Sequence, residues 1–152
     1  MKNINSIYYI LVEVVLMCTL IAYGSNNGIT KNLAMSLSEK LDSEVDVRNT
    51  KYNSSFYLDK YENVLIGINL EDGEISTEIQ RFIENNIEEF KFKKLGFFTV
   101  NKDEKQINYI DNNLPKEFTG LINFEEHFKK EDEEKIYNFV DVLNNNLALA
   151  YN

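Results

Sequence analysis

The chain has 152 residues, of which 43% are hydrophobic and 27% are charged, with one proline, six glycines and no tryptophan. This composition is ordinary for a globular domain and argues against a disordered or collagen-like chain. The length is typical of a single domain with a core of its own. The net charge of −9 repels nucleic acid and anionic membrane surfaces, so we expect neither as a partner.

The chain contains a single cysteine and a single histidine, which restricts its chemistry. With Cys18 alone, an internal disulfide or a cysteine-based zinc site cannot form, and a reducing, cytoplasmic location is favoured. We interpret Cys18 as a small buried residue at the start of a strand rather than as a nucleophile. His127 lies near the end of an acidic segment and is interpreted as a surface residue.

The first 16 residues, MKNINSIYYILVEVVL, are apolar from Ile7 onward and run directly into the next strand. The apolar stretch 7–23 is interrupted by Glu13 and is shorter than the roughly 20 residues of a membrane span. No small-residue cleavage site of a signal peptide follows it. We interpret residues 1–16 as an N-terminal extension or a misassigned start, with a weak membrane anchor as the alternative.

Short apolar runs then alternate with amphipathic segments. The near-continuous run at 64–68 predicts a central parallel strand covered on both faces. The residues between 49 and 62 predict a loop or short helix, and residues 125–134 predict a solvated loop and the start of a helix. Five alternations predict an α/β fold whose parallel sheet has helices on both faces. The predicted strands are 18–23, 44–48, 63–69, 94–100 and 119–124, and the predicted helices are 29–41, 76–90, 107–114 and 136–147.

The segment between the first strand and the first helix carries the pattern of an anion-binding loop. The N–H groups at the start of a helix have no partner within it, and the helix dipole adds partial positive charge there. Gly24 and Gly28 allow the backbone to approach a ligand closely. Hydroxyl and amide donors come from Ser25, Thr30, Asn26 and Asn27.

With its flanking residues this segment reads YGSNNGIT, and it resembles the phosphate loop of flavodoxins, whose pattern is roughly S/T-x-x-G-x-T. Ser25, Gly28 and Thr30 match that pattern. The resemblance implies that residues 17–152 form a flavodoxin-like three-layer sandwich with a five-stranded parallel sheet in the order 2-1-3-4-5. It also implies FMN as the cofactor, held through its phosphate without a metal.

Two later segments extend the resemblance. VLIGINLEDGEIS resembles flavodoxins and, more closely, flavodoxin-type protoporphyrinogen oxidases, with Gly67, Asn69 and Gly73 at matching positions. KLGFFTVN resembles the next strand and the start of its loop. The cofactor-binding residues that the resemblance implies are Ser25, Asn26, Asn27, Gly28, Ile29 and Thr30 in the first loop, Asn69, Leu70, Glu71, Asp72 and Gly73 in the second, and Thr99, Val100 and Asn101 in the third.

The function implied by the resemblance is electron transfer between FMN and redox protein partners. One alternative is an oxidoreductase of the protoporphyrinogen oxidase type, although the long insert expected before the last strand is missing. The other is a flavodoxin fold that has lost FMN and acts as a binding or regulatory module. The last alternative is favoured by the second and third loops, which lack an aromatic residue to stack on the flavin and have Asp72 where a tyrosine would stand. Glu71 and Asp72 are expected to lower the flavin potential.

Overall fold

The computed structural model describes residues 18–24, 28–52, 57–100, 103–129 and 132–149. The predicted extension 1–16 lies outside these residues, so its nature and the domain boundary at Met17 stay predictions. The strands are β1 (Cys18–Tyr23), β2 (Glu44–Asn49), β3 (Asn63–Glu71), β4 (Glu74–Ile75), β5 (Lys94–Val100) and β6 (Phe124–Phe128). The helices are α2 (Gly28–Lys40), α3 (Thr77–Phe90), α4 (Glu104–Asn113), α5 (Lys116–Thr119) and α6 (Glu133–Leu149).

The sheet has the predicted topology. Its parallel strands lie in the order β2-β1-β3-β5-β6, which is 2-1-3-4-5 when the parallel strands alone are counted. The run 63–69 is buried throughout, as a central strand covered on both faces must be. The edge strands β2 and β6 carry charged residues that solvate one face of each strand.

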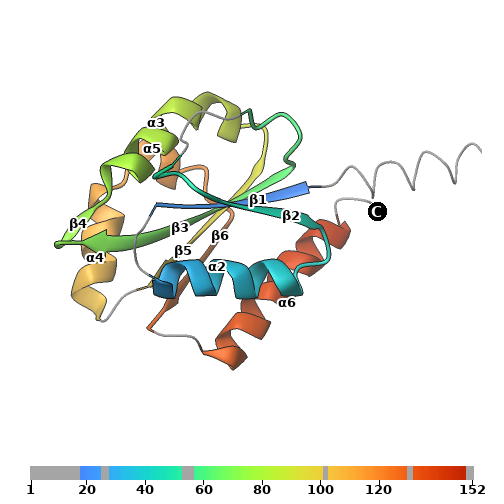
Figure 1. Ribbon diagram of the computed structural model, residues 1–152. Helices are drawn as coiled ribbons and strands as arrows, with labels where there is room; N and C mark the ends of the chain where they lie inside the picture. The colour runs from blue at the N-terminus through green and yellow to red at the C-terminus, as the bar shows by residue number, and fades with distance from the viewer. Residues whose placement is uncertain (1–17, 25–27, 53–56, 101–102, 130–131, 150–152) are drawn as a thin grey trace, which may run out of the picture.

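Helices cover both faces of the sheet (Figure 1), with α2 and α6 on one face and α3, α4 and α5 on the other. The core under α2 and α6 is built from alternate strand residues such as Ile21, Leu65 and Phe98. The opposite core contains their strand neighbours, such as Leu20, Val64 and Phe97. This alternation decides which side chains near the end of each strand face α2. Among the described helices, none combines the length and the apolar character needed to cross a membrane.

The predicted position of the fifth strand, 119–124, is wrong, because the last parallel strand, β6, begins only at Phe124. The residues assigned to it instead end the short helix α5 and continue as a loop, from which Leu121 and Ile122 pack against the core. The observed strand has the sequence FEEHF, and its charged residues by themselves predict a solvated loop. An edge strand with one solvated side tolerates such residues.

The second loop contains a hairpin that the sequence analysis did not predict. β4 pairs antiparallel with the end of β3, and the two are joined by Asp72 and Gly73, whose φ angles are 52° and 80°. Two consecutive positive φ values are the requirement of a type I′ turn, for which Asp-Gly is a preferred pair. The Asp-Gly pair was therefore a readable signal for this hairpin.

The connection from β2 to β3 has no helix in its described residues, 50–52 and 57–62. A polar cluster attaches it to the sheet instead. The Tyr61 hydroxyl donates to Asp46 Oδ2 over 2.6 Å, and Lys60 Nζ lies 2.9 Å from the same oxygen. The Tyr61 hydrogen bond, followed by the Lys60 contact, lowers the pKa of the Asp46 carboxyl.

We expect Tyr61→Phe to reduce the free energy of unfolding by about 1.5 kcal/mol, because it removes a hydrogen bond to a charged acceptor.

The low pKa of Asp46 in the folded state is a source of stability that depends on pH. The contribution is fully present above the pKa of the unfolded state, about 4, and it is lost as pH falls through the pKa of the folded state. Asp46→Asn should therefore flatten the loss of stability between about pH 5 and pH 3. Urea titrations across this range test both effects, with the exposed Tyr57→Phe as a control that should change neither.

Candidate functional site

The carboxyl ends of the parallel strands meet at one edge of the sheet, where α/β proteins of this topology bind ligands. The pairing register aligns Tyr23 with Gly67, Asn69 with Val100, and Val100 with Phe128. In Figure 1 this edge is marked by the arrowhead of β3 and by the hairpin strand β4. All three predicted loops follow strands that end here. Ser25, Asn26, Asn27 and Asn101 lie outside the described residues, so their roles stay predictions.

Thr30 is the described residue of the first loop with the clearest ligand-binding character. It lies in the first turn of α2 with none of its surface exposed, and its Oγ1 has no hydrogen-bond partner among the described residues. A buried hydroxyl without a partner costs about 1–3 kcal/mol. Gly28 and Ile29, which precede it, are exposed. The helix start therefore presents solvent-accessible backbone beside a hydroxyl that needs an acceptor or donor.

Gly24 allows the chain to leave β1 closely packed against its surroundings. A Cβ atom there would lie 2.7 Å from Ile79 Cγ1 and 2.7 Å from Thr50 Oγ1. Thr50 also holds the end of β1, because its N–H donates to the Tyr23 carbonyl over 2.7 Å. A glycine is therefore required where β1 turns toward α2.

Asn69, near the end of β3, carries a second unsatisfied polar atom. The residue is buried with 6% exposure, and its Oδ1 has no hydrogen-bond partner within the part of the chain that the structure describes. Leu65 faces α2, so the strand alternation places Asn69 on that same face of the sheet. Thr30, which lies on α2, and Asn69 therefore occupy one face at the carboxyl edge. Both residues are among the predicted site residues, but their common face and their lack of partners among the described residues depend on the tertiary structure.

The remaining residues of the second loop belong to the hairpin, in which Leu70 and Glu71 end β3 and Asp72 and Gly73 form the turn. Leu70 and Glu71 are half-buried, whereas Asp72 and Gly73 are exposed. Glu71 Oε2 lies 3.5 Å from Lys51 Nζ, an ion pair that reaches from the end of β2 across β1 to β3. Lys51 therefore partly balances the negative charge expected here from Glu71. The sequence alone does not indicate that these two residues pair.

The two described residues of the third loop, Thr99 and Val100, direct their side chains to opposite faces of the sheet. Val100 belongs to the core under α2 and α6, on the face that carries Asn69. Thr99 is fully buried on the opposite face, where its Oγ1 lies 2.6 Å from His127 Nδ1. The Thr99 side chain is thus directed away from Thr30 and Asn69. Only its backbone can contribute to a ligand site on the α2 face.

His127 was interpreted as a surface residue, but its side chain is only 23% exposed. Besides the Thr99 contact, the ring packs edge-on against Phe97, with the two ring centroids 5.9 Å apart. Its Nε2 lies 3.4 Å from Glu125 Oε2. This role could not be read while the fifth strand was placed at 119–124. Correct placement of β6 makes His127 the direct neighbour of Thr99 in the sheet.

Cys18 is half-buried at the opposite, amino edge of the sheet. Burial, followed by the nearby Glu44 carboxylate, raises the pKa of its thiol. The thiol is thus held protonated, which agrees with a residue that is not a nucleophile.

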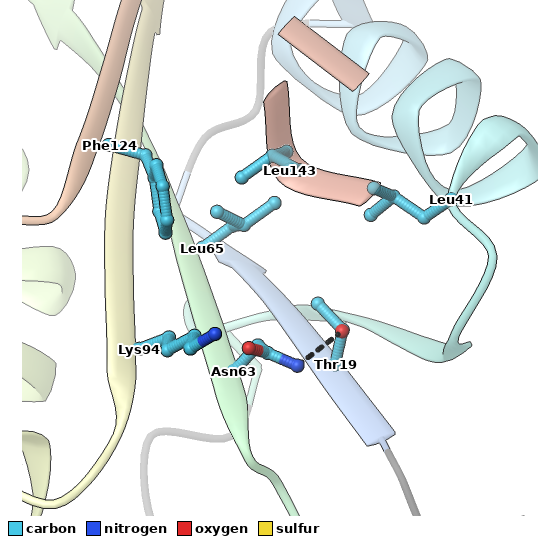
Figure 2. A pocket seen from close by; sticks show the side chains of 7 residues that line it. All are labelled: Thr19, Leu41, Asn63, Leu65, Lys94, Phe124 and Leu143. Carbon is cyan, nitrogen blue, oxygen red and sulfur yellow. Dashed lines mark hydrogen bonds between the residues drawn. The ribbon is translucent and has the colours of Figure 1, made fainter. Parts of the chain in front are cut away.

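A small cavity also lies at this amino edge (Figure 2), between the sheet and the ends of α2 and α6. Its volume is about 10 Å³, enough for a single water molecule at most. Asn63 Nδ2 donates to Thr19 Oγ1 at its floor over 3.3 Å. This cavity is a packing feature and is too small for a ligand.

The comparison with known families agrees with the fold. Residues 20–143 match the family model described as the flavodoxin domain, and the chain belongs to this family. Among curated protein sequences, none matches the chain.

Several solved structures share the fold. A flavodiiron core from Synechocystis sp. PCC6803 superimposes with a TM-score of 0.69 at 15% identity, covering 99% of this chain and 40% of that one. The rubredoxin oxygen:oxidoreductase of Desulfovibrio gigas gives 0.66 at 11% identity, covering 90% and 36%. A flavodoxin from Streptococcus pneumoniae gives 0.59 at 20% identity, covering 88% and 99%. The chain thus spans less than half the length of the first two proteins, and these similarities show the fold alone.

Proposed function

We propose that this protein binds FMN at the carboxyl edge of its sheet and transfers electrons to or from protein partners. The observation that carries the proposal is the pair of buried polar atoms without partners, Thr30 Oγ1 and Asn69 Oδ1. They lie on the same face of the sheet, at the edge where this topology binds ligands. A ligand with both anionic and hydrogen-bond-donating groups would satisfy them.

The groups present fit the two ends of FMN. The Thr30 hydroxyl can donate to a phosphate, together with the backbone N–H groups at the start of α2. The Asn69 amide oxygen can accept from a ribityl hydroxyl or a ring N–H. When bound, the flavin supplies the electron chemistry, while the surrounding groups of the chain determine its potential. The ion pair between Lys51 and Glu71 moderates the negative charge at this edge and hence the expected lowering of that potential.

The proposal of electron transfer draws on the family and on the charge. A protein from Streptococcus pneumoniae with the same fold is named a flavodoxin, and proteins of Synechocystis and Desulfovibrio that contain this fold are named as a flavodiiron core and an oxidoreductase. With a net charge of −9, the surface is suited to transient contact with a basic protein partner. The protoporphyrinogen oxidase alternative rests on sequence resemblance alone.

FMN titration of the purified protein, followed by quenching of flavin fluorescence, tests the proposal. We expect saturable quenching by the wild-type protein. Asn69→Ala should weaken binding about tenfold, because one hydrogen bond to the bound ligand is lost. Asn86→Ala is the matched control, since Asn86 donates to the Phe82 carbonyl on α3, away from this edge. It should bind FMN as the wild type does.

The outcomes separate the functional alternatives. Wild-type protein that leaves FMN fluorescence unchanged at high concentration would favour the module that has lost FMN. Quenching with equal affinity in Asn69→Ala and Asn86→Ala would contradict the assigned site. Binding with the expected loss supports the site, and the transfer of electrons to a basic redox protein such as cytochrome c then becomes measurable by stopped-flow spectroscopy.

A further inference from the structure

Another cavity lies at the carboxyl edge, and none of the described residues predicted to bind flavin is among those that line it. Its volume is about 340 Å³, within the range of pockets that hold small molecules. It lies where the start of α4, the end of β6 and the start of α6 come together (Figure 1). Its lining residues are Asp103, Glu104, Ile107, His127, Phe128, Lys129 and Lys135.

The two walls of this cavity carry opposite charges. The wall at α4 supplies the carboxylates of Asp103 and Glu104, whereas the wall at β6 and α6 supplies the ammonium groups of Lys129 and Lys135. Ile107 and Phe128 add apolar surface between them. A ligand with several phosphates is disfavoured here, because the two carboxylates would repel it.

Half of these charges already have partners within the protein. Lys135 Nζ donates to the His127 carbonyl over 2.6 Å and lies 3.4 Å from Glu126 Oε1. Asp103 Oδ1 accepts the Gln106 N–H over 3.0 Å, and thereby caps α4.

The other two charges, Glu104 and Lys129, form no ion pair with each other or with another described residue, although both face the same cavity. A molecule that entered the cavity with a single charge would remove water from both groups and compensate only one of them. A molecule with one ammonium and one carboxylate would compensate both. Its apolar part would lie on Ile107 and Phe128.

We infer that this cavity binds a small zwitterion of amino-acid size with an apolar side chain. Lys129 binds its carboxylate and Glu104 binds its ammonium group. The His127 ring forms part of the same cavity and contacts Thr99 of the proposed flavin site through Nδ1. A bound zwitterion would therefore lie one strand away from the residues that flank the proposed flavin. The inference itself does not depend on FMN.

His127 supplies a direct reporter, because it is the only histidine of the chain and borders the cavity. Its imidazole signals in NMR spectra of the untagged, flavin-free protein are therefore unambiguous. We would titrate three matched probes at pH 7.5: phenylalanine, 3-phenylpropionate, which lacks the ammonium group, and 2-phenylethylamine, which lacks the carboxylate. Phenylalanine should shift the His127 signals saturably, and each single-charge analogue should bind at least about tenfold more weakly.

Glu104→Gln and Lys129→Gln should each reduce phenylalanine binding by about tenfold. Lys105→Gln is the matched control, because Lys105 is an exposed residue of α4 that does not line the cavity. All three changes are at exposed positions, so the variants should keep the wild-type NMR spectrum elsewhere. The inference is overturned if phenylalanine gives no saturable shift, if either analogue binds as tightly as phenylalanine, or if Glu104→Gln and Lys129→Gln behave like Lys105→Gln. Because no readout involves flavin, a failure here is distinguishable from a failure to bind FMN.

Discussion

Thr30→Val is expected to weaken FMN binding by about tenfold or more, while raising the free energy of unfolding of the flavin-free protein by about 1 kcal/mol. Both effects have one cause. The Thr30 hydroxyl is fully buried and has no hydrogen-bond partner, so without a ligand it destabilises the fold. A methyl group of similar size removes that cost. The same replacement removes a donor to the phosphate, so stability and affinity change in opposite directions.

This opposition distinguishes a ligand-binding hydroxyl from a structural one. Urea unfolding without FMN and fluorescence titration with FMN measure the two quantities separately. Ser38→Ala is the control on the same helix, since the Ser38 hydroxyl donates to the Met35 carbonyl on its more exposed side. It should leave FMN affinity unchanged and should not raise stability. A Thr30→Val protein that is less stable than the wild type, or one that binds FMN equally well, would show that the hydroxyl does not act on the phosphate.

Gly67→Ala is expected to reduce the free energy of unfolding by about 2–3 kcal/mol. A Cβ atom at this position would lie 2.6 Å from Phe98 Cζ and 2.9 Å from Phe98 Cε2. Phe98 is fully buried and packs edge-on against Phe128 with ring centroids 6.4 Å apart. An added Cβ at this position therefore requires the enclosed Phe98 ring or the β3–β5 strand pair to shift.

Gly28→Ala is the matched control for this steric argument. Apart from its chain neighbours and the backbone of its own helix, no described residue has an atom within 4 Å of a Cβ built at Gly28, so the effect of the change on stability should be neutral or slightly favourable. Thermal unfolding of both variants without flavin tests the comparison. Equal melting temperatures for Gly67→Ala and the wild type would show that the β3–β5 packing adapts more easily than the buried aromatic rings suggest.

Much of the fold was predictable because local patterns and tertiary packing agree. β1 and β5 begin and end at the predicted residues, since each is a short apolar run. Ser76 lies at the predicted start of its helix and caps α3, accepting the Ile79 N–H over 3.3 Å. The errors occur where the two disagree. The run TGLINF is apolar although it does not form a strand, whereas FEEHF is charged and forms the edge of the sheet.

The candidate site divides in the same way. The glycine-rich segment before α2 and the position of Asn69 and Val100 near the carboxyl ends of their strands followed from the sequence, because loop chemistry and strand order are local properties. Three features of the site could not be predicted from the sequence. They are the orientation of Thr99 away from the α2 face, its contact with His127, and the ion pair between Lys51 and Glu71. Each depends on which residues of different strands lie opposite one another.

The amino-acid sequence by itself determined the alternation of strands and helices and the parallel sheet, and it predicts a loop suited to an anion. These follow from hydrophobic periodicity and from the conformational preferences of glycine and polar residues. Only the tertiary structure decided which polar atoms lack partners and which charges face one cavity. Burial and pairing are properties of groups that are distant in sequence, and no local pattern records whether Thr30 and Asn69 find a partner when the chain folds.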